Sequence, residues 1–185
     1  MSYLVIPPLI QAALVRIARE AAPAECCGLL LGNAHEVLEC HPLPNTAADP
    51  TTAFAIEPNA LLRCLQHAES KGYNLLASFH SHPGAVPHPS PSDVTAARQD
   101  GSPPVQVIVG LRGQAAFLQA WHITPFDVES LPIADSLNDL TPSFYTPLTS
   151  AQRWALIISG VVCAALLLAV SISLLPPAPP IPLPR

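Results

Sequence analysis

Hydrophobic residues recur with a helical period near the N-terminus and with a strand period after it. Over residues 9–20, directly after Pro8, apolar side chains repeat on one face and predict an amphipathic helix that ends at Pro23. The apolar run over 26–31 is short enough for a buried strand. The alternation over 36–40 predicts a half-buried strand that pairs with it as a hairpin.

The same patterns continue through the next eighty residues. Apolar runs predict strands, and one-sided apolar faces predict helices. The further elements expected are strand 52–56, helix 59–70, strand 75–80, helix 92–98, and strands 105–110 and 115–121. This order predicts one domain of mixed strands and helices, which we bound at 1–130.

The periodicity is lost after Pro132. Residues 131–153 are rich in Pro, Ser, Thr and Asp and predict a linker. Residues 154–175 carry no charge and match the roughly 20 residues that a transmembrane helix needs. A buried core helix is the alternative, although a core helix of this length usually has a polar stripe. Residues 176–185 predict a Pro-rich tail.

The composition supports a membrane segment. The 185 residues are 50% hydrophobic and 11% charged, whereas about 25% of residues are charged in typical soluble domains. The mean hydropathy is +0.37. No basic N-terminal region marks a secretory signal. This layout predicts a single-pass membrane protein whose N-terminal domain is cytoplasmic.

Charge and cysteine content argue against two classes of protein. A formal net charge of −5 disfavours sequence-independent binding of nucleic acid, which needs a basic face. The odd number of cysteines does not form a disulfide framework or a Cys-x-x-Cys zinc site, and we expect free thiols in a reducing compartment. These cysteines are Cys26, Cys27, Cys40, Cys64 and Cys163.

The residues most suited to chemistry follow the strand predicted over 75–80. His80 and His82 stand two positions apart, so on a strand both side chains point to one face. Asp93, at the start of the helix predicted over 92–98, would add a carboxylate oxygen. This ligand set suits zinc, and three protein ligands leave a position for water, as in catalytic zinc sites.

The same residues also have a purely structural interpretation. Ser90 and Asp93, with a proline between them, form a helix-start signature related to the capping box. A His-x-His pair on its own has low specificity. The joint pattern, His80-x-His82-Pro followed at a fixed distance by Ser90-x-x-Asp93, is far more specific and favours the metal site.

This joint pattern resembles the motif of the JAMM metalloproteases, also called the MPN-plus group. The family has an upstream glutamate, then His-x-His-Pro, then Ser-x-x-Asp with seven residues in between. Here residues 83–89 separate His82 from Ser90, and Glu25 is the upstream match. The resemblance covers about residues 3–123 and is to compact bacterial members. It implies an α/β (α+β) fold with a mixed, strongly curved sheet flanked by helices, similar to cytidine deaminases.

The resemblance also assigns roles to the motif residues. It implies that His80, His82 and Asp93 bind Zn²⁺. Glu25 would hold the attacking water and carry its proton to the leaving amine, and Ser90 would donate a hydrogen bond to the developing oxyanion.

The expected activity is that of a zinc-dependent peptidase or isopeptidase. JAMM enzymes typically cut after the C-terminal Gly-Gly of ubiquitin or a ubiquitin-like protein, and the compact bacterial type implies a ubiquitin-like or sulfur-carrier protein substrate. The alternative is a non-catalytic, membrane-anchored interaction module, which the complete motif disfavours. A DNA-repair-type protein with a similar pattern is disfavoured by the acidic charge. A homodimer stays open.

Other side chains have weaker claims to chemistry. Cys26 and Cys27 are candidate nucleophiles, but no base is placed near them by spacing. We expect His88 to be a solvated loop residue and Asn45 to lie near the substrate groove. The remaining histidines are each expected to be structural; these are His35, His41, His67 and His122.

Overall fold

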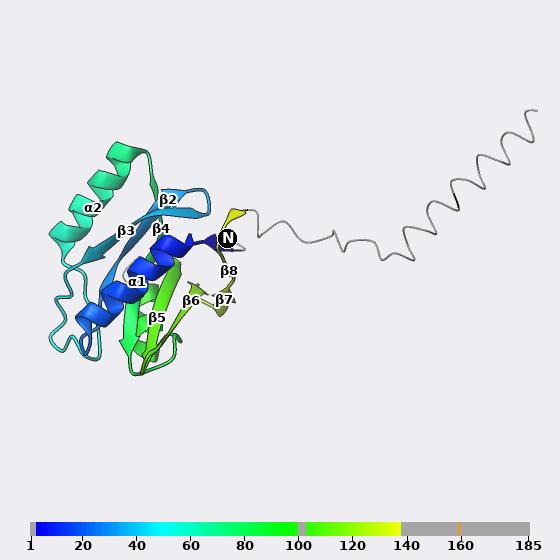
Figure 1. Ribbon diagram of the computed structural model, residues 1–185. Helices are drawn as coiled ribbons and strands as arrows, with labels where there is room; N and C mark the ends of the chain where they lie inside the picture. Colours follow the sequence, from blue (N-terminus) through cyan, green and yellow to red (C-terminus); the bar gives the residue numbers. More distant parts are fainter. Residues whose placement is uncertain (1–2, 100–102, 138–158, 160–185) are drawn as a thin grey trace, which may run out of the picture. The chain divides into compact units, whose positions relative to one another are not determined.

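The computed structural model describes residues 3–99, 103–137 and 159, and its strands form one mixed sheet (Figure 1). The chain divides into two units, Met1–Thr141 and Pro142–Arg185, and the elements below lie in the first. They are β1 (Leu4–Val5), α1 (Pro8–Ala21), β2 (Cys27–Asn33), β3 (Glu36–Leu43), α2 (Pro58–Lys71), β4 (Asn74–Pro83), α3 (Pro91–Gln99), β5 (Val105–Arg112), β6 (Ala115–Ile123), β7 (Val128–Leu131) and β8 (Ile133–Ala134).

The strands are ordered β7-β6-β5-β4-β2-β3-β1-β8 across the sheet. β2 is antiparallel to both β3 and β4, as the predicted hairpin requires. β4 and β5 are parallel, and α3 lies in the connection between them. A sheet that mixes both strand directions, with helices beside it, confirms the predicted α+β fold class for this part of the chain.

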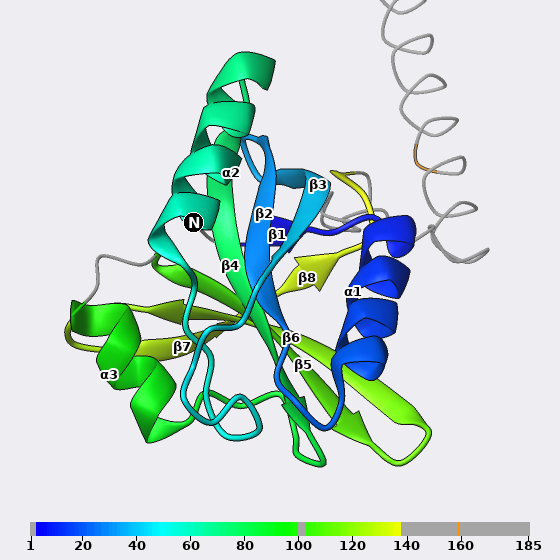
Figure 2. The same ribbon diagram turned by 90° about the vertical axis from the view of Figure 1, so that its left-hand side faces the viewer.

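Helices α1 and α2 cover opposite faces of the sheet (Figure 2). Leu30 belongs to the core cluster that contains Leu14 of α1, whereas Leu29 and Leu31 belong to the cluster that contains Cys64 of α2. Successive side chains on a strand point to opposite faces. The strand β2 therefore needs an apolar residue at every position, which explains its unbroken apolar run.

Helix α2 begins and ends where its sequence provides the caps. The Glu57 carboxylate accepts hydrogen bonds from the backbone N–H groups of Asn59 and Ala60. Gly72 ends the helix with a left-handed backbone, φ 69°, which glycine adopts without steric cost. The predicted helix over 59–70 is confirmed.

The strand predicted over 52–56 is wrong. Only a single bridge, between Asn45 and Ile56, marks this segment. The side chain of Asn45 takes the place of a partner strand, because its Nδ2 donates to the carbonyl of Ala53 and its Oδ1 accepts from the N–H of Ala55, at 3.0 and 3.1 Å. Residues 44–57 therefore form a loop, in which the Asn45 amide and the backbone bond from Thr46 N–H to the carbonyl of Ala55 hold the two arms together.

The sheet continues past residue 130, where a linker was predicted to begin. Ile133 and Ala134 in β8 pair in parallel with β1 at Leu4 and Val5. Leu131, at the end of β7, is buried. The strands therefore extend into the range 131–153, while the rest of the predicted division into segments stays a prediction.

The predicted membrane location is corrected. Among the residues that the structure describes, no helix is both long enough and apolar enough to cross a bilayer. On this finding the predicted single-pass membrane localisation is wrong. The predicted cytoplasmic placement was derived from that localisation and is withdrawn with it. The segment 154–175 itself lies, apart from Ser159, outside the described residues, as does the tail 176–185.

Candidate active site

The predicted histidine pair lies at the carboxyl end of the central strand β4. The Nε2 atoms of His80 and His82 are 3.1 Å apart. His80 is fully buried, and its ring stacks on Phe54 of the 44–57 loop with centroids 4.5 Å apart. His80 pairs with Cys27 of β2 and Ile108 of β5, and His82 pairs with Gly110 of β5, so both imidazoles stand on a strand in the interior of the sheet.

Asp93 faces this pair from the first turn of α3. Its Oδ2 lies 3.5 Å from Nε2 of His80 and 3.2 Å from Nε2 of His82. The same oxygen accepts hydrogen bonds from the backbone N–H and the hydroxyl of Ser90, both at 2.7 Å. The helix-start interpretation of Ser90-x-x-Asp93 is therefore confirmed, and the same carboxylate also faces the two histidines.

Backbone contacts bring Glu25 to the same place from far upstream. The hydroxyl of Ser81 accepts a hydrogen bond from the N–H of Cys26 at 2.9 Å, and the N–H of Ser81 donates to the carbonyl of Cys26 at 3.0 Å. The amide of Asn45 donates to the carbonyl of Glu25 at 3.0 Å. Ser81 and Asn45 thus position Glu25 beside the histidines.

Sequence reasoning assigned no role to Ser81. Its place between the two histidines puts its side chain on the opposite face of β4, and that alternation was the signal that could have found it. Asn45 was expected near the groove, and the structure places it against the Glu25 backbone.

Burial and neighbouring charges shift the pKa values of the site residues in different directions. Burial raises the pKa of Glu25 to about 7, with His82 lowering it and Asp93 raising it. Burial lowers the pKa of His80 and keeps this imidazole neutral, the form that binds metals. Burial alone would raise the pKa of Asp93, but hydrogen bonds with His80 and His82 hold it well below its usual range. Two carboxylates thus share one buried corner.

These residues fit a divalent metal ion. One ligand atom each from His80, His82 and Asp93 lies within 4.8 Å of the others. Oε2 of Glu25 is buried and has no hydrogen-bond partner among the described residues, which suits a carboxylate whose partner is a water molecule. Two imidazoles and one carboxylate are a zinc ligand set with an open position.

The loop between His82 and Ser90 is held over β5. Nε1 of Trp121 donates to the carbonyl of Pro87 at 2.8 Å. A Cβ atom at Gly110 would lie 2.7 Å from Pro87, closer than real contacts allow. His88 is exposed in this loop, as expected, and its ring also stacks edge-on against Trp121 with centroids 4.7 Å apart.

The cysteines next to Glu25 are unsuited to nucleophilic catalysis. Cys26 and Cys27 are buried, and burial raises the pKa of both thiols, that of Cys27 to about 12. A thiol in this state is scarcely ionised at neutral pH. All the cysteines in the described part of the chain are free, as expected.

Comparison with known proteins agrees with this geometry. Residues 8–124 match the family of prokaryotic homologs of the JAB domain. The chain belongs to this family. The match spans the glutamate, the histidine pair and the aspartate, and it confirms the JAMM resemblance.

Two curated relatives and one solved structure illustrate the similarity. A "probable TtuB-protein conjugate cleaving protease" of Thermus thermophilus is 41% identical over 110 residues, which is 60% of this chain and 71% of that protein. A desampylase of Haloferax volcanii is 39% identical over 90 residues, 45% of this chain and 65% of that one. A solution structure from Desulfitobacterium hafniense has TM-score 0.63 and 26% identity, covering 71% and 91% of the two chains. The chain is therefore an enzyme of the JAMM protease type.

Proposed function

We propose that this chain is a zinc-dependent isopeptidase or peptidase that cuts after the C-terminal Gly-Gly of a ubiquitin-like or sulfur-carrier protein. The observation that carries the proposal is the convergence of His80, His82 and Asp93 beside a buried carboxylate with an unpartnered oxygen. The names of the relatives, which refer to conjugate cleavage and desampylation, support the substrate class.

In this proposal His80, His82 and Asp93 hold the zinc ion. When bound there, zinc supplies a Lewis acid and lowers the pKa of water toward about 7. Glu25 accepts the proton of the attacking water and delivers it to the leaving amine. Ser90 donates its hydroxyl hydrogen to the developing oxyanion, and this requires the hydroxyl to leave its bond with Asp93.

The surroundings of the histidines favour an extended, partly apolar substrate tail. A hollow of about 360 Å³ lies beside His80 and is lined by apolar side chains that include Phe54, Ile56 and Leu65. An apolar residue upstream of the Gly-Gly pair would fill it. Glycines at the scissile end would need the least space beside the buried imidazole of His80.

The test compares cleavage with metal content. The full chain is incubated with an isopeptide-linked conjugate of a small ubiquitin-like protein, and products are identified by mass spectrometry. We expect Glu25→Gln to keep stoichiometric zinc and to lose at least about 100-fold in kcat, the lower range for removing a general base. A conjugate in which Gly-Gly is replaced by Ala-Ala is the matched substrate control.

Two results would contradict the proposal. Full activity of Glu25→Gln would remove the glutamate from the reaction. A wild-type chain that binds no zinc and cleaves nothing would favour the alternative, a non-catalytic interaction module.

A further inference from the structure

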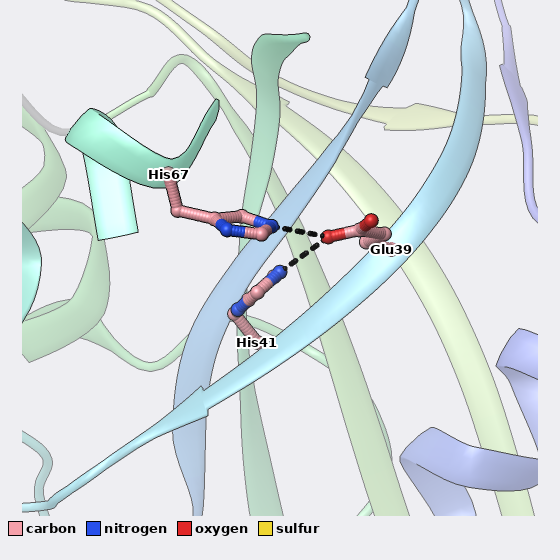
Figure 3. A group of neighbouring side chains, drawn as sticks. All are labelled: Glu39, His41 and His67. Carbon is pink, nitrogen blue, oxygen red and sulfur yellow. Dashed lines mark hydrogen bonds and ion pairs between the residues drawn. The ribbon is translucent and has the colours of Figure 1, made fainter. Parts of the chain in front are cut away.

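A second group of metal-binding side chains lies away from the active site, between β3 and α2. Nε2 of His41 and Nε2 of His67 both lie 2.7 Å from the same oxygen, Oε2 of Glu39 (Figure 3). Glu39 and His41 stand two positions apart on β3 and so share a face of the sheet. His67 reaches them from α2, as Figure 3 shows.

The arrangement repeats that of the active-site pair. The rings of His41 and His67 have centroids 4.7 Å apart at an angle of 52°, and those of His80 and His82 are 4.9 Å apart at 57°. In both groups two Nε2 atoms converge on one carboxylate oxygen, and in both the ligand atoms lie within 4.8 Å of one another.

We propose that Glu39, His41 and His67 form a second site for a divalent transition-metal ion of the zinc type. Two imidazoles and a carboxylate suit such ions. Ligands about 2.0–2.1 Å from zinc in tetrahedral geometry lie roughly 3.3 Å apart. The carboxylate oxygen therefore needs to withdraw by only about half an ångström from each nitrogen to admit the ion.

The surroundings leave room for the ion and for water ligands. His41 and His67 line a hollow of about 320 Å³, and the side chains of His41, His67 and Glu39 are each 30–37% exposed. Arg63, which lines the same hollow, is paired with Glu57 at 3.7 Å.

The second site acts on the loop that forms one wall of the active site. Residues 44–57 connect the His41 strand to the His67 helix, and they carry Asn45 and Phe54, which contact Glu25 and His80. An ion bound to both ends of this connection restricts the loop, because cross-linking two points removes conformational freedom from the chain between them.

The test counts metal ions per chain. The full chain is stripped with a chelator and dialysed against Zn²⁺, and bound metal is measured by mass spectrometry. We expect two ions in wild type, one in His67→Ala and one in His82→Ala. The double variant should bind none. His122→Ala, which changes a histidine on the distant strand β6, is the matched control and should keep two.

The comparison of His82→Ala with the double variant decides the proposal, whatever the active site holds. A loss of one ion on adding His67→Ala to His82→Ala supports the second site, and equal zinc content in these two variants overturns it. In the His82→Ala background we also expect added Zn²⁺ to slow amide hydrogen exchange in 44–57. Unchanged exchange at full occupancy would overturn the coupling to the loop. Neither readout uses catalysis, so failure of the proposed activity is distinguished from failure of this site.

Discussion

At the residue scale, the burial of Glu25 opposes the folded state, whereas the proposed function requires this carboxylate to be buried beside the histidines. It is 7% exposed and stands near another carboxylate, and burial raises its pKa to about 7 from the ordinary 4.5. A buried carboxylate is costly when ionised. In the proposed function, a zinc ion bound by His80, His82 and Asp93 would offset that cost, and metal binding would then stabilise the fold around Glu25.

This conflict predicts a pH-dependent effect of Glu25→Gln on the metal-free fold. Between about pH 4.5 and 7 the folded state holds the Glu25 proton more tightly than the unfolded state, so wild-type stability falls as pH rises through this window. We expect the variant to be more stable by about 1–3 kcal/mol at pH 8 and equal to wild type near pH 4. Urea unfolding with a chelator present measures this, and a stability difference that does not change with pH would contradict it.

Asp93 lies in the first turn of α3 and, in the proposed function, also binds zinc, so Asp93→Asn should separate these two roles. The amide oxygen still accepts from Ser90 at the start of α3, but it is a weaker ligand. Even loss of an outer-shell partner costs about 10–100-fold in metal affinity, so we expect zinc affinity to fall by more than about 100-fold while the helix is kept. Zinc titration followed by circular dichroism measures both properties. Unchanged affinity would place Asp93 outside the ligand set.

At the scale of elements, the site depends on how β2 is fastened to β4. Ser81 is buried, and its hydroxyl oxygen accepts a hydrogen bond from the backbone N–H of Cys26, the residue after Glu25. This hydrogen bond fixes the backbone of Cys26 against β4, and so it also fixes the position of Glu25, the preceding residue. The sequence predicted both strands, but it did not predict this cross-connection, since only the register of the sheet brings the two segments together.

We therefore expect Ser81→Ala to weaken both stability and catalysis while zinc stays bound. The change leaves the buried N–H of Cys26 without its acceptor, which costs about 1–3 kcal/mol. A displaced Glu25 lowers kcat. Thermal unfolding, zinc content and cleavage kinetics are measured beside Ser130→Ala, an exposed serine on β7. Ser81→Ala kinetics equal to those of the control would show that the bond does not position Glu25.

The loop over β5 makes a similar prediction through Gly110. A Cβ atom there would meet Pro87 at 2.7 Å and the carbonyl oxygen of Ala85 at 2.8 Å, so Gly110→Ala must push the loop away. This loop leads from His82 to Ser90. Because a misplacement of about 1 Å can cost about 100-fold in rate, we expect a loss of that order in kcat/KM. Gly113→Ala, with no neighbour within 4 Å, controls for a glycine substitution that meets no neighbour, although its positive φ adds local strain. Wild-type rates in Gly110→Ala would contradict the expectation.

At the scale of the whole molecule, the catalytic unit ends later than its sequence pattern indicates. The strand β8 pairs with β1, and Leu131 is 4% exposed within the main core cluster. We expect a chain ending at residue 130 to be less stable than one ending at residue 141 by about 2–4 kcal/mol, the cost of losing a buried leucine and its neighbours. Urea unfolding of both fragments measures this, and equal stability would return the boundary to 130.

The sequence by itself determined the local parts of this protein. Period-two spacing puts His80 and His82 on one face of a strand, and helix-start chemistry puts Asp93 in the first turn of a helix, because both effects act over a few residues. Only the tertiary structure decided which distant segments meet. It brought Glu25 to the proposed metal ligands through β2–β4 pairing, joined His67 to Glu39 and His41, and gave the 52–56 backbone the Asn45 side chain as partner. These contacts depend on sheet register and helix packing, which no spacing along the chain specifies.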